Sequence, residues 1–393
     1  MRVPPREVLP PLSVDEARHS EALMAVIREQ LGQGGGWLSF ERFMELALYA
    51  PGLGYYSAGS HKLGAGGDFV TAPEVSDLFS RCVARQCAQI LALTGGEILE
   101  LGAGTARMAC ALLAELAAAG CLPERYAILE VSADLTQRQR DRVAQLPRVL
   151  RERIVWLTQL PSAPFTGVML ANEVADALPC RRFVLSGGGM LELGAALDPA
   201  GRLTDTAAPP AAVLLNECTR LFAELDAPLP EGYVSEVCLR ADAWVASLAE
   251  VLQRGALLLF DYGLPRRHYY HPQRDTGTLR CHFRQRVHDD PYINVGLQDI
   301  TAWVDFTRLA QAGLTAGLAV EGFATQAAFL LASGIEAMTG AATSDRERVR
   351  LAGEARRLML PEEMGEAFKV LALTRGLQVP LAGFALQDLR RLL

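Results

Sequence analysis

Two carboxylates flank a glycine turn in a pattern that suits a nucleotide-like ligand. Glu100 lies in a short apolar run, two residues before Gly102-Ala103-Gly104, and the next apolar run along the chain ends in Glu130. An Ala/Leu-rich helical pattern follows the turn, so the stretch predicts a strand, a tight turn and a helix N-terminus. Glycines at 102 and 104 let the backbone turn and let a ligand lie against it, beside the free N–H groups of the helix.

Two cofactor classes compete for this loop. A dinucleotide fingerprint requires a third glycine where this chain has Arg107. Glu100 instead suits a cofactor with a cationic amino-acid end, such as S-adenosylmethionine, and would repel a pyrophosphate. Glu130 is placed to accept hydrogen bonds from both ribose hydroxyls. The alternative is an ordinary strand-turn-helix in which Glu130 only caps a strand; we expect the S-adenosylmethionine site.

A second polar group follows a later apolar run. The predicted strand 165–172 ends in Asn172-Glu173, and Asp176 lies three residues after Glu173. On the first turn of a helix these two carboxylates would face the same side. They would then either act in a reaction or simply favour a helix N-terminus, and the spacing leaves both interpretations open.

A glycine-rich loop, residues 63–74, precedes the predicted helix 75–93. It is either a connector or a loop that folds over the cofactor, because Asp68, Thr71 and Glu74 place polar groups beside flexible backbone.

The remaining pattern alternates strands and helices, which predicts a parallel sheet with ligands at the carboxyl ends of its strands. Glu100, Glu130, Asn172, Glu173 and Asp261 all fall at such ends. The predicted strands are 98–101, 126–130, 153–157, 165–172 and 256–261. Further on we expect helices at 303–311, 325–339 and 344–358, then a terminal antiparallel pair formed by 368–374 and the segment up to Leu386.

Composition excludes several classes of protein. Half of the 393 residues are hydrophobic and 21% are charged, as in a globular chain of one large or two smaller domains. The net charge of −7 gives no reason to expect a nucleic-acid partner. No apolar run is long enough for a membrane span, and the first dozen residues resemble neither a signal nor a transit peptide. We therefore expect a cytoplasmic protein.

The cysteines and histidines do not form a regular metal site. The eight cysteines include no C-x-x-C pair and are typical of reduced, buried side chains. The segment 262–301 is too long for an ordinary connector, and a substrate lid is the more natural interpretation. Its candidate metal ligands, which match no zinc spacing, are His268, His271, Cys281, His282, His288 and Asp289.

Several longer motifs resemble one family. They include S-F-E-R-F-M-E-L-A-L-Y-A-P-G-L-G-Y-Y from Ser39, G-D-F-V-T-A-P-E from Gly67, E-L-G-A-G from Glu100, I-L-E-V-S from Ile128 and N-E-V-A-D-A-L-P from Asn172. Others begin at Asp261, Tyr269, Gly277, His288, Gly296 and Glu363. Together they resemble the MidA family of S-adenosylmethionine-dependent methyltransferases, which is linked to assembly of respiratory complex I in mitochondria. The sequence departs from the family at Ala106, usually glycine, and at Ala175.

The resemblance implies an α/β fold: a Rossmann-like class I methyltransferase sheet with a helical N-terminal region and an inserted subdomain. We expect the N-terminal region and cofactor-covering loop at 1–80 and the first part of the core at 81–178. The inserted subdomain would then be 179–242, and the remainder of the core 243–393, with the lid and the C-terminal strand pair.

The resemblance also implies a reaction, methylation of an arginine in a complex I subunit. A guanidinium must approach the cationic sulfonium, and carboxylates can pair with it and offset the repulsion. On that basis Glu173, Asp176 and Asn172 are the candidate catalytic residues. The alternatives are a non-catalytic factor that holds cofactor or client and a small-molecule methyltransferase. The sequence leaves the oligomeric state open, with a homodimer as one option.

Overall fold

The computed structural model describes residues 9–58 and 71–393, which group into two compact units. Within the described residues, unit 1 comprises 9–58, 176–240 and 266–303, and unit 2 comprises 71–175, 241–265 and 304–393. Asp68 lies outside the described residues, so its predicted contact with the cofactor stays a prediction. The boundaries that the sequence analysis proposes for the domains also stay predictions.

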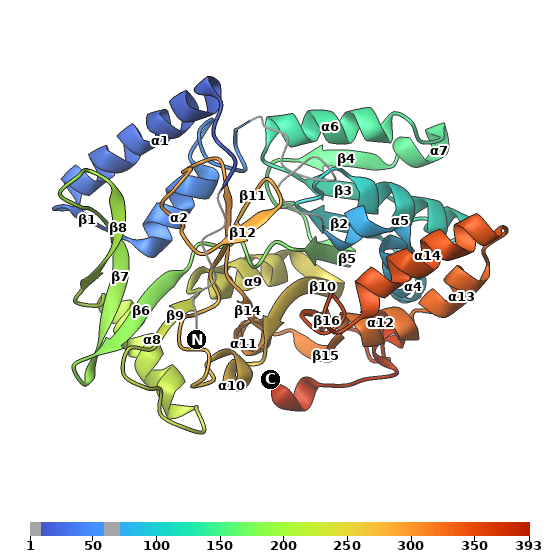
Figure 1. Ribbon diagram of the computed structural model, residues 1–393. Coiled ribbons are helices and arrows are strands. Elements are labelled where there is room, and N and C mark those ends of the chain that lie inside the picture. Colours follow the sequence, from blue (N-terminus) through green and yellow to red (C-terminus); the bar gives the residue numbers. More distant parts are fainter. Residues whose placement is uncertain (1–8, 59–70) are drawn as a thin grey trace. The chain divides into compact units, whose positions relative to one another are not determined.

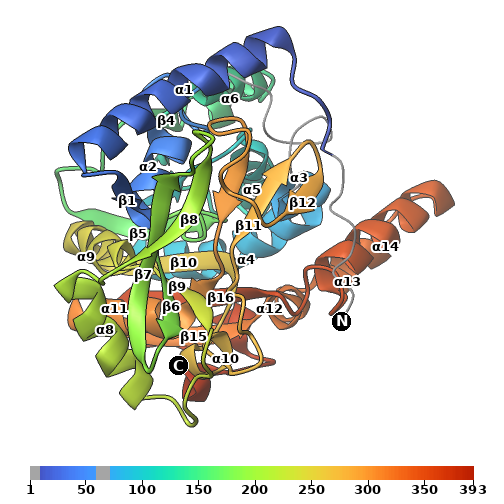
Figure 2. The ribbon, with the colours of Figure 1, turned by 60° about the vertical axis from the view of Figure 1, so that its left-hand side comes forward.

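Unit 2 is built on a mixed sheet of eight strands in the order β15-β16-β10-β5-β2-β3-β4, with β14 beside β10 (Figures 1 and 2). The strands are β2 (Glu97–Leu101), β3 (Tyr126–Leu129), β4 (Ile154–Leu157), β5 (Phe165–Asn172), β10 (Leu252–Leu264), β14 (Val304–Asp305), β15 (Ala319–Thr325) and β16 (Phe368–Arg375). The pairs among β4, β3, β2, β5 and β10 are all parallel, as the alternation predicts. The α/β fold class is thereby confirmed.

The helices of unit 2 connect these strands. They are α3 (Ala72–Val75), α4 (Asp77–Thr94), α5 (Arg107–Ala118), α6 (Ala133–Val143), α7 (Arg148–Arg151), α9 (Arg240–Val251, which begins at the unit boundary), α11 (Phe306–Thr315), α12 (Gln326–Ala332), α13 (Ile335–Gly340) and α14 (Asp345–Met359). Two 3-10 helices, η1 (Ala382–Phe384) and η2 (Arg390–Leu392), follow β16. The predicted helix 325–339 is wrong as one element, because Gly334, at φ +83°, separates α12 from α13.

The C-terminal strand pair also differs from the prediction. β16 pairs antiparallel with β10 on one side and with β15 on the other, whereas the residues after Gly376 form η1 and η2. The predicted partner up to Leu386 is therefore wrong. Residues 319–325 take that place, and their short mixed pattern lacks the alternation that identifies a strand.

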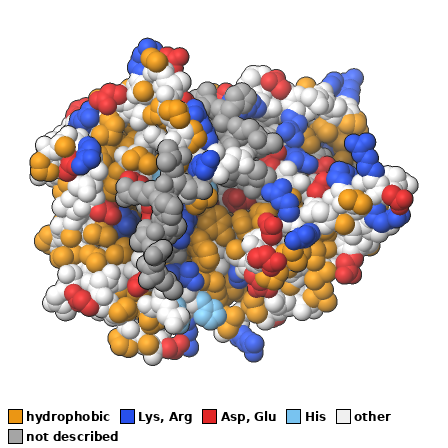
Figure 3. Space-filling view, viewed as in Figure 1, with side chains coloured by type: hydrophobic (Ala, Val, Ile, Leu, Met, Phe, Trp, Pro, Cys, Tyr) orange, Lys and Arg blue, Asp and Glu red, His pale blue; other side chains and the backbone are white. Residues whose placement is uncertain are grey.

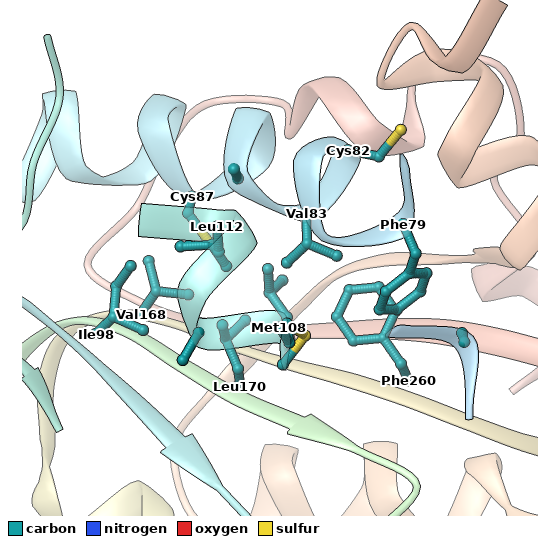
Figure 4. Close-up of a cluster of buried hydrophobic side chains, with 14 of the residues drawn as sticks. Phe79, Cys82, Val83, Cys87, Ile98, Met108, Leu112, Val168, Leu170 and Phe260 are labelled. Carbon is teal, nitrogen blue, oxygen red and sulfur yellow. The ribbon is translucent and has the colours of Figure 1, made fainter. Parts of the chain in front are cut away.

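One face of the sheet carries the main core of unit 2. Figure 4 shows Phe79 and Val83 of α4 and Met108 of α5 packed over Leu170 of β5 and Phe260 of β10. Successive side chains of a strand alternate between faces, so the other face carries residues such as Leu257 and Leu371. The sheet is thus buried on both sides, and only its strand ends are left to carry polar groups.

The outer surface of α14 carries charges of both signs. Asp345 pairs with Arg348, and Arg350 pairs with Glu354, each one turn apart. In Figure 3, blue and red side chains are interspersed at the right, where α14 lies in Figure 1. This is typical of a solvated helix face rather than a single-sign binding patch.

Unit 1 contains a second sheet and a small third one. Its helices are α1 (Val14–Gln33), α2 (Phe40–Tyr49), α8 (Ala212–Ala223) and α10 (Arg266–Tyr269). Its larger sheet runs β1-β7-β6-β9 with β8 beside β7, from β1 (Trp37–Ser39), β6 (Arg181–Ser186), β7 (Gly189–Leu197), β8 (Leu203–Ala208) and β9 (Val234–Val237). Residues 262–301, the predicted lid, contain a three-stranded sheet of β11 (Arg280–Phe283), β12 (Arg286–His288) and β13 (Asp299–Thr301).

Local signals explain the first helix. Ser13 and Glu16 form the expected capping box: Glu16 N donates to Ser13 Oγ at 3.3 Å, and Ser13 N donates to Glu16 Oε2 at 2.7 Å.

Among the described residues, no helix combines the length and the apolar character needed to cross a bilayer.

Candidate cofactor and acceptor site

The carboxyl ends of neighbouring parallel strands gather the predicted polar residues of unit 2. Glu100 lies near the end of β2, Glu130 directly follows β3, and Asn172 ends β5. β2 lies between β3 and β5, and its Glu100 is in register with Ile128 and Leu170. The structure therefore brings these three predicted residues to one edge of the sheet, where open parallel sheets bind ligands.

The turn after β2 is built on left-handed backbone. Gly102 and Gly104 have φ of +63° and +54°, which only glycine adopts without cost. Gly102 is exposed and donates its N–H to Leu129 O at 3.1 Å, which ties the turn to β3. Ala106 also has a positive φ of +60° and precedes α5.

Glu100 is buried beneath this turn, with only 2% of its surface exposed. Tyr126 on β3 donates its hydroxyl to Glu100 Oε2 at 2.7 Å. Burial raises the pKa of Glu100 to about 7; the Tyr126 hydrogen bond opposes that rise and the charge of Glu130 adds to it. A group that titrates near neutrality, next to a ligand loop, is typical of a functional carboxylate.

Glu130 is 7% exposed and held on both oxygens. Ser132 N donates to Oε1 at 2.8 Å, and Gln139 Nε2 donates to Oε2 at 3.0 Å. Burial raises the pKa of Glu130, while these hydrogen bonds favour its charged form. Sequence reasoning found Glu130 but missed Gln139, since a glutamine inside a charged helix carries no recognisable signal.

Thr71 and Glu74 lie at the start of unit 2. Glu74 Oε1 accepts a hydrogen bond from the Thr105 hydroxyl in the glycine turn, and Glu74 O accepts one from Arg107 at 2.6 Å. Thr71 precedes α3 without a capping side-chain bond. Glu74 is thus tied to the turn, whereas direct contact of either residue with a cofactor stays a prediction.

Glu173 lies on a strained turn after β5. Its φ is +53°, a region that costs a non-glycine residue about 1–3 kcal/mol. Glu173 N donates to Phe260 O at 2.9 Å, and Asp261 Oδ2 accepts Ala175 N at 3.0 Å, so β10 holds the turn on both sides. The sequence places Asp261 at a strand end, but it shows neither this strain nor the hydrogen bond that Asp261 accepts from Ala175 N.

The carboxylate of Glu173 faces polar neighbours. Glu173 Oε1 accepts from Ala72 N at 3.3 Å and from Asn172 Nδ2 at 3.2 Å. Asn172 Oδ1 is buried and has no hydrogen-bond partner within the described residues. An amide oxygen in this position can accept a hydrogen bond from a ligand.

Asp176 belongs to unit 1, where its backbone oxygen accepts Ala302 N at 3.0 Å. The residue is 5% exposed. Burial raises the pKa of Tyr56, and the charges of Asp299 and Asp176 add to that rise. Glu173 belongs to unit 2, so the predicted pairing of the two carboxylates stays a prediction.

The histidines and Cys281 of 262–301 are candidate metal ligands of that segment. Cys281 and His288 are paired across β11 and β12, and burial lowers the pKa of His282 to about 4. Within residues 9–58 and 71–393, no group of three or more His, Cys, Asp or Glu side chains is placed to hold a metal ion.

Comparison with known proteins agrees with this geometry. A family model described as "Putative S-adenosyl-L-methionine-dependent methyltransferase" matches residues 82–324. Protein arginine methyltransferase NDUFAF7, mitochondrial, from Danio rerio is 28% identical over 365 residues, 85% of this chain and 82% of that protein. The human protein of that name is 28% identical over 378 residues, 86% and 80% of the two chains.

Solved structures extend the likeness to nearly the whole chain. A crystal structure from Burkholderia thailandensis with bound S-adenosyl-homocysteine matches with a TM-score of 0.94 and 41% identity, over 98% of this chain and 100% of that one. A native structure from the same organism matches with a TM-score of 0.91 at the same identity and coverage. The chain belongs to the family of S-adenosyl-L-methionine-dependent methyltransferases, and its cofactor is S-adenosyl-L-methionine. The resemblance and the cofactor prediction are confirmed.

Proposed function

We propose that this methyltransferase acts on an arginine side chain of a protein, and that the protein is a subunit of respiratory complex I during its assembly. The observation that carries the proposal is the Glu173 carboxylate, held on a strained turn at the sheet edge that also presents Glu100 and Glu130. The relatives from Danio rerio and human are named protein arginine methyltransferases, which supports the choice of acceptor.

Each part of the sheet edge suits one part of the cofactor. Glu100 would pair with the cationic amino group, and the bare backbone of Gly102 and Gly104 would lie against the amino-acid end. Glu130 would accept hydrogen bonds from the ribose hydroxyls, as a buried carboxylate at the end of the second strand can. When bound, the cofactor supplies an electrophilic methyl group on a sulfonium.

The protein then has to bring a second cation to this methyl group. A guanidinium has a pKa above about 12 and is always charged, so Glu173 would pair with it and offset the repulsion between the two cations. Asn172 Oδ1 is free to accept an N–H of the same group. Asp176 would be a second carboxylate for the guanidinium, as the resemblance implies.

One observation favours a different role for Glu173. Its Oε1 already accepts Ala72 N at the start of α3, so the side chain could serve only to cap that short helix. The chain would then be a factor that binds cofactor or client without turnover. The variant Glu173→Gln distinguishes the two functions. Its amide oxygen can still cap α3, but it has no negative charge to pair with a guanidinium.

The proposal extends to the cellular location and the partners of the protein. We propose a cytoplasmic protein with a protein substrate and no nucleic-acid partner; the mitochondrial location belongs to the names of the relatives. Size-exclusion chromatography with light scattering would distinguish a monomer from a homodimer, and fractionation of cells would test the location.

Mass spectrometry of arginine methylation provides the direct test. Proteins from cells with and without this chain are compared, and those from cells without it are incubated with the purified chain and methyl-labelled cofactor. We expect one complex I subunit to lose an arginine methylation in cells without the chain and to regain it in vitro. Label on a lysine, on a small molecule or on no acceptor would overturn the proposed substrate.

A further inference from the structure

We propose that Gln139 of α6 is a positioning residue for the cofactor: its amide, oriented by Trp156, fixes Glu130 and the glycine turn together and sets the pH range in which cofactor binds. Gln139 is fully buried, with 0% exposed. Its Nε2 donates to Glu130 Oε2 and to Gly104 O, each at 3.0 Å. One side chain therefore connects Glu130 with the glycine turn.

Trp156 on β4 determines which way the amide points. Its Nε1 donates to Gln139 Oε1 at 2.9 Å. An indole N–H is only a donor, so the amide oxygen must face Trp156 and the NH₂ group must face Glu130 and Gly104. With the amide rotated by 180°, its NH₂ group would face the indole N–H and its oxygen would face two acceptors. Only the observed orientation makes all three hydrogen bonds.

The amide also controls how Glu130 and the turn move. Gly104 lies on left-handed backbone in the turn, and its carbonyl accepts the hydrogen bond from Gln139 Nε2. By donating to that carbonyl and to the carboxylate at the same time, Gln139 keeps the backbone and the ribose-binding group at a fixed separation. Preorganisation of this kind lowers the cost of binding.

The charge state of Glu130 depends on few groups. Burial raises its pKa, and the hydrogen bonds from Ser132 N, Gln139 Nε2 and Val131 N oppose the rise. Glu130 also acts on Glu100 of β2: the charge of Glu130 raises the pKa of Glu100, which accepts a hydrogen bond from Tyr126 of β3. Removal of the Gln139 donor should therefore raise the pKa of Glu130 and weaken binding at its acidic end.

The test is the pH dependence of S-adenosyl-homocysteine affinity, measured by calorimetry on the full chain from about pH 5 to about pH 9. Gln139→Met keeps the volume and removes the donor. We expect affinity at neutral pH to fall about tenfold. Because Glu100 also titrates on the acid side, with a pKa of about 7, the profile is measured in a Glu100→Gln background as well, and there Gln139→Met should move the remaining acidic limb to higher pH. Gln137→Met, at an exposed glutamine on the same helix, is the matched control and should retain the parent profile.

A purely structural role for Gln139 would lower the melting temperature but leave the shape of the pH profile unchanged, and this result would overturn the proposal. If Gln139→Met does not fold, Trp156→Phe decides the question, because it removes the donor that orients the amide. A shift of the acidic limb in the same direction supports the proposal, and a parent-like profile overturns it.

The inference rests on the proposed role of Glu130, so Glu130→Ala is measured alongside. If Glu130→Ala leaves the affinity unchanged, the assignment of the ribose site fails and this inference fails with it. If Glu130→Ala weakens binding while Gln139→Met has the parent affinity and profile, only the positioning role is overturned.

Discussion

Two turns at the same edge of the sheet reach left-handed backbone in opposite ways. The turn after β2 places glycines there, Gly102 and Gly104, so the conformation costs little and the backbone stays bare. The turn after β5 places Glu173 there, at φ +53°, and β10 holds it through Phe260 O and Asp261. The first turn suits a ligand that lies on the backbone, and the second keeps a particular side chain despite its cost.

The difference assigns separate tasks to the two turns. A strained residue persists only where its surroundings over-determine it, and such residues cluster at functional sites. Glycine or asparagine would relieve the strain at 173, so a role for the carboxylate itself explains why the turn carries glutamate. We therefore expect changes in the first turn to alter cofactor affinity and changes in the second to alter methyl transfer.

The largest expected effect is at Glu173. Glu173→Gln keeps the shape and can still accept Ala72 N, but it removes the charge that would pair with a guanidinium. We expect methyl transfer to fall by about 1,000-fold at saturating cofactor, with S-adenosyl-homocysteine affinity unchanged. Label transfer to protein arginine measures the first and calorimetry the second. Glu250→Gln, at an exposed position on α9, should behave as the parent.

Gly104→Val should abolish most cofactor binding. A branched side chain would occupy the space over the turn and force a φ of +54° that valine resists, so we expect affinity to fall by about 100-fold or more. Gly120→Val is the control for strain alone: its φ is +69°, and open space surrounds the added Cβ. It should lose about 1–2 kcal/mol of stability and keep the affinity; equal loss of affinity in both variants would remove the loop from the cofactor site.

Glu130→Ala should have a smaller effect. The loss of one or two hydrogen bonds to ribose weakens affinity by about 1–3 kcal/mol, without change in the choice of acceptor. Calorimetry with S-adenosyl-homocysteine and with free adenosine separates ribose contacts from the rest. An unchanged affinity for both would leave Glu130 as a strand-end carboxylate held by Ser132 and Gln139.

The smallest effect near neutral pH is the pH dependence from Glu100. Its pKa of about 7 means that protonation below neutrality removes the partner of the cationic amino group, so affinity should fall by up to about tenfold per pH unit there. Tyr126→Phe removes a hydrogen bond that lowers this pKa and should move the acidic limb to higher pH. A limb that stays in place would show that Glu100 does not govern binding.

The same shift has a consequence for the stability of the protein without cofactor. The folded pKa of Glu100 lies above the ordinary value of 4.5, so between about pH 4.5 and about pH 7 the folded state binds more protons than the unfolded state. The contribution of Glu100 to the free energy of unfolding therefore decreases as the pH rises through that window. Thermal unfolding of the parent and of Glu100→Gln would measure the difference.

The sequence predicts the parallel core well because its signals are local. Apolar runs, the glycine turn and the Ser13–Glu16 capping box each mark an element within a few residues, and the structure has strands and helices at these places. The strand β15 was missed because its pattern is mixed and its partner, β16, lies more than 40 residues away. The pairing of β16 depends on contacts that no local pattern records.

The candidate site likewise contains residues that the sequence predicts and residues that only the structure identifies. Glu100, Gly102, Gly104 and Glu130 follow from the strand-end rule and lie together at one edge of the sheet. Gln139 could not be predicted, because its importance comes from burial and from partners on three other segments. The strain at Glu173 is equally invisible in the sequence, since only the backbone dihedral reveals it.

The most direct test measures affinity and turnover together in two variants, one expected to affect cofactor binding and one expected to affect methyl transfer. Glu130→Ala and Glu173→Gln are compared with the parent for S-adenosyl-homocysteine affinity and for label transfer to protein arginine at saturating cofactor. We predict that Glu130→Ala loses affinity and keeps most of its turnover, whereas Glu173→Gln keeps its affinity and loses turnover by about 1,000-fold. Turnover of Glu173→Gln within a few-fold of the parent would contradict the proposed role of this carboxylate.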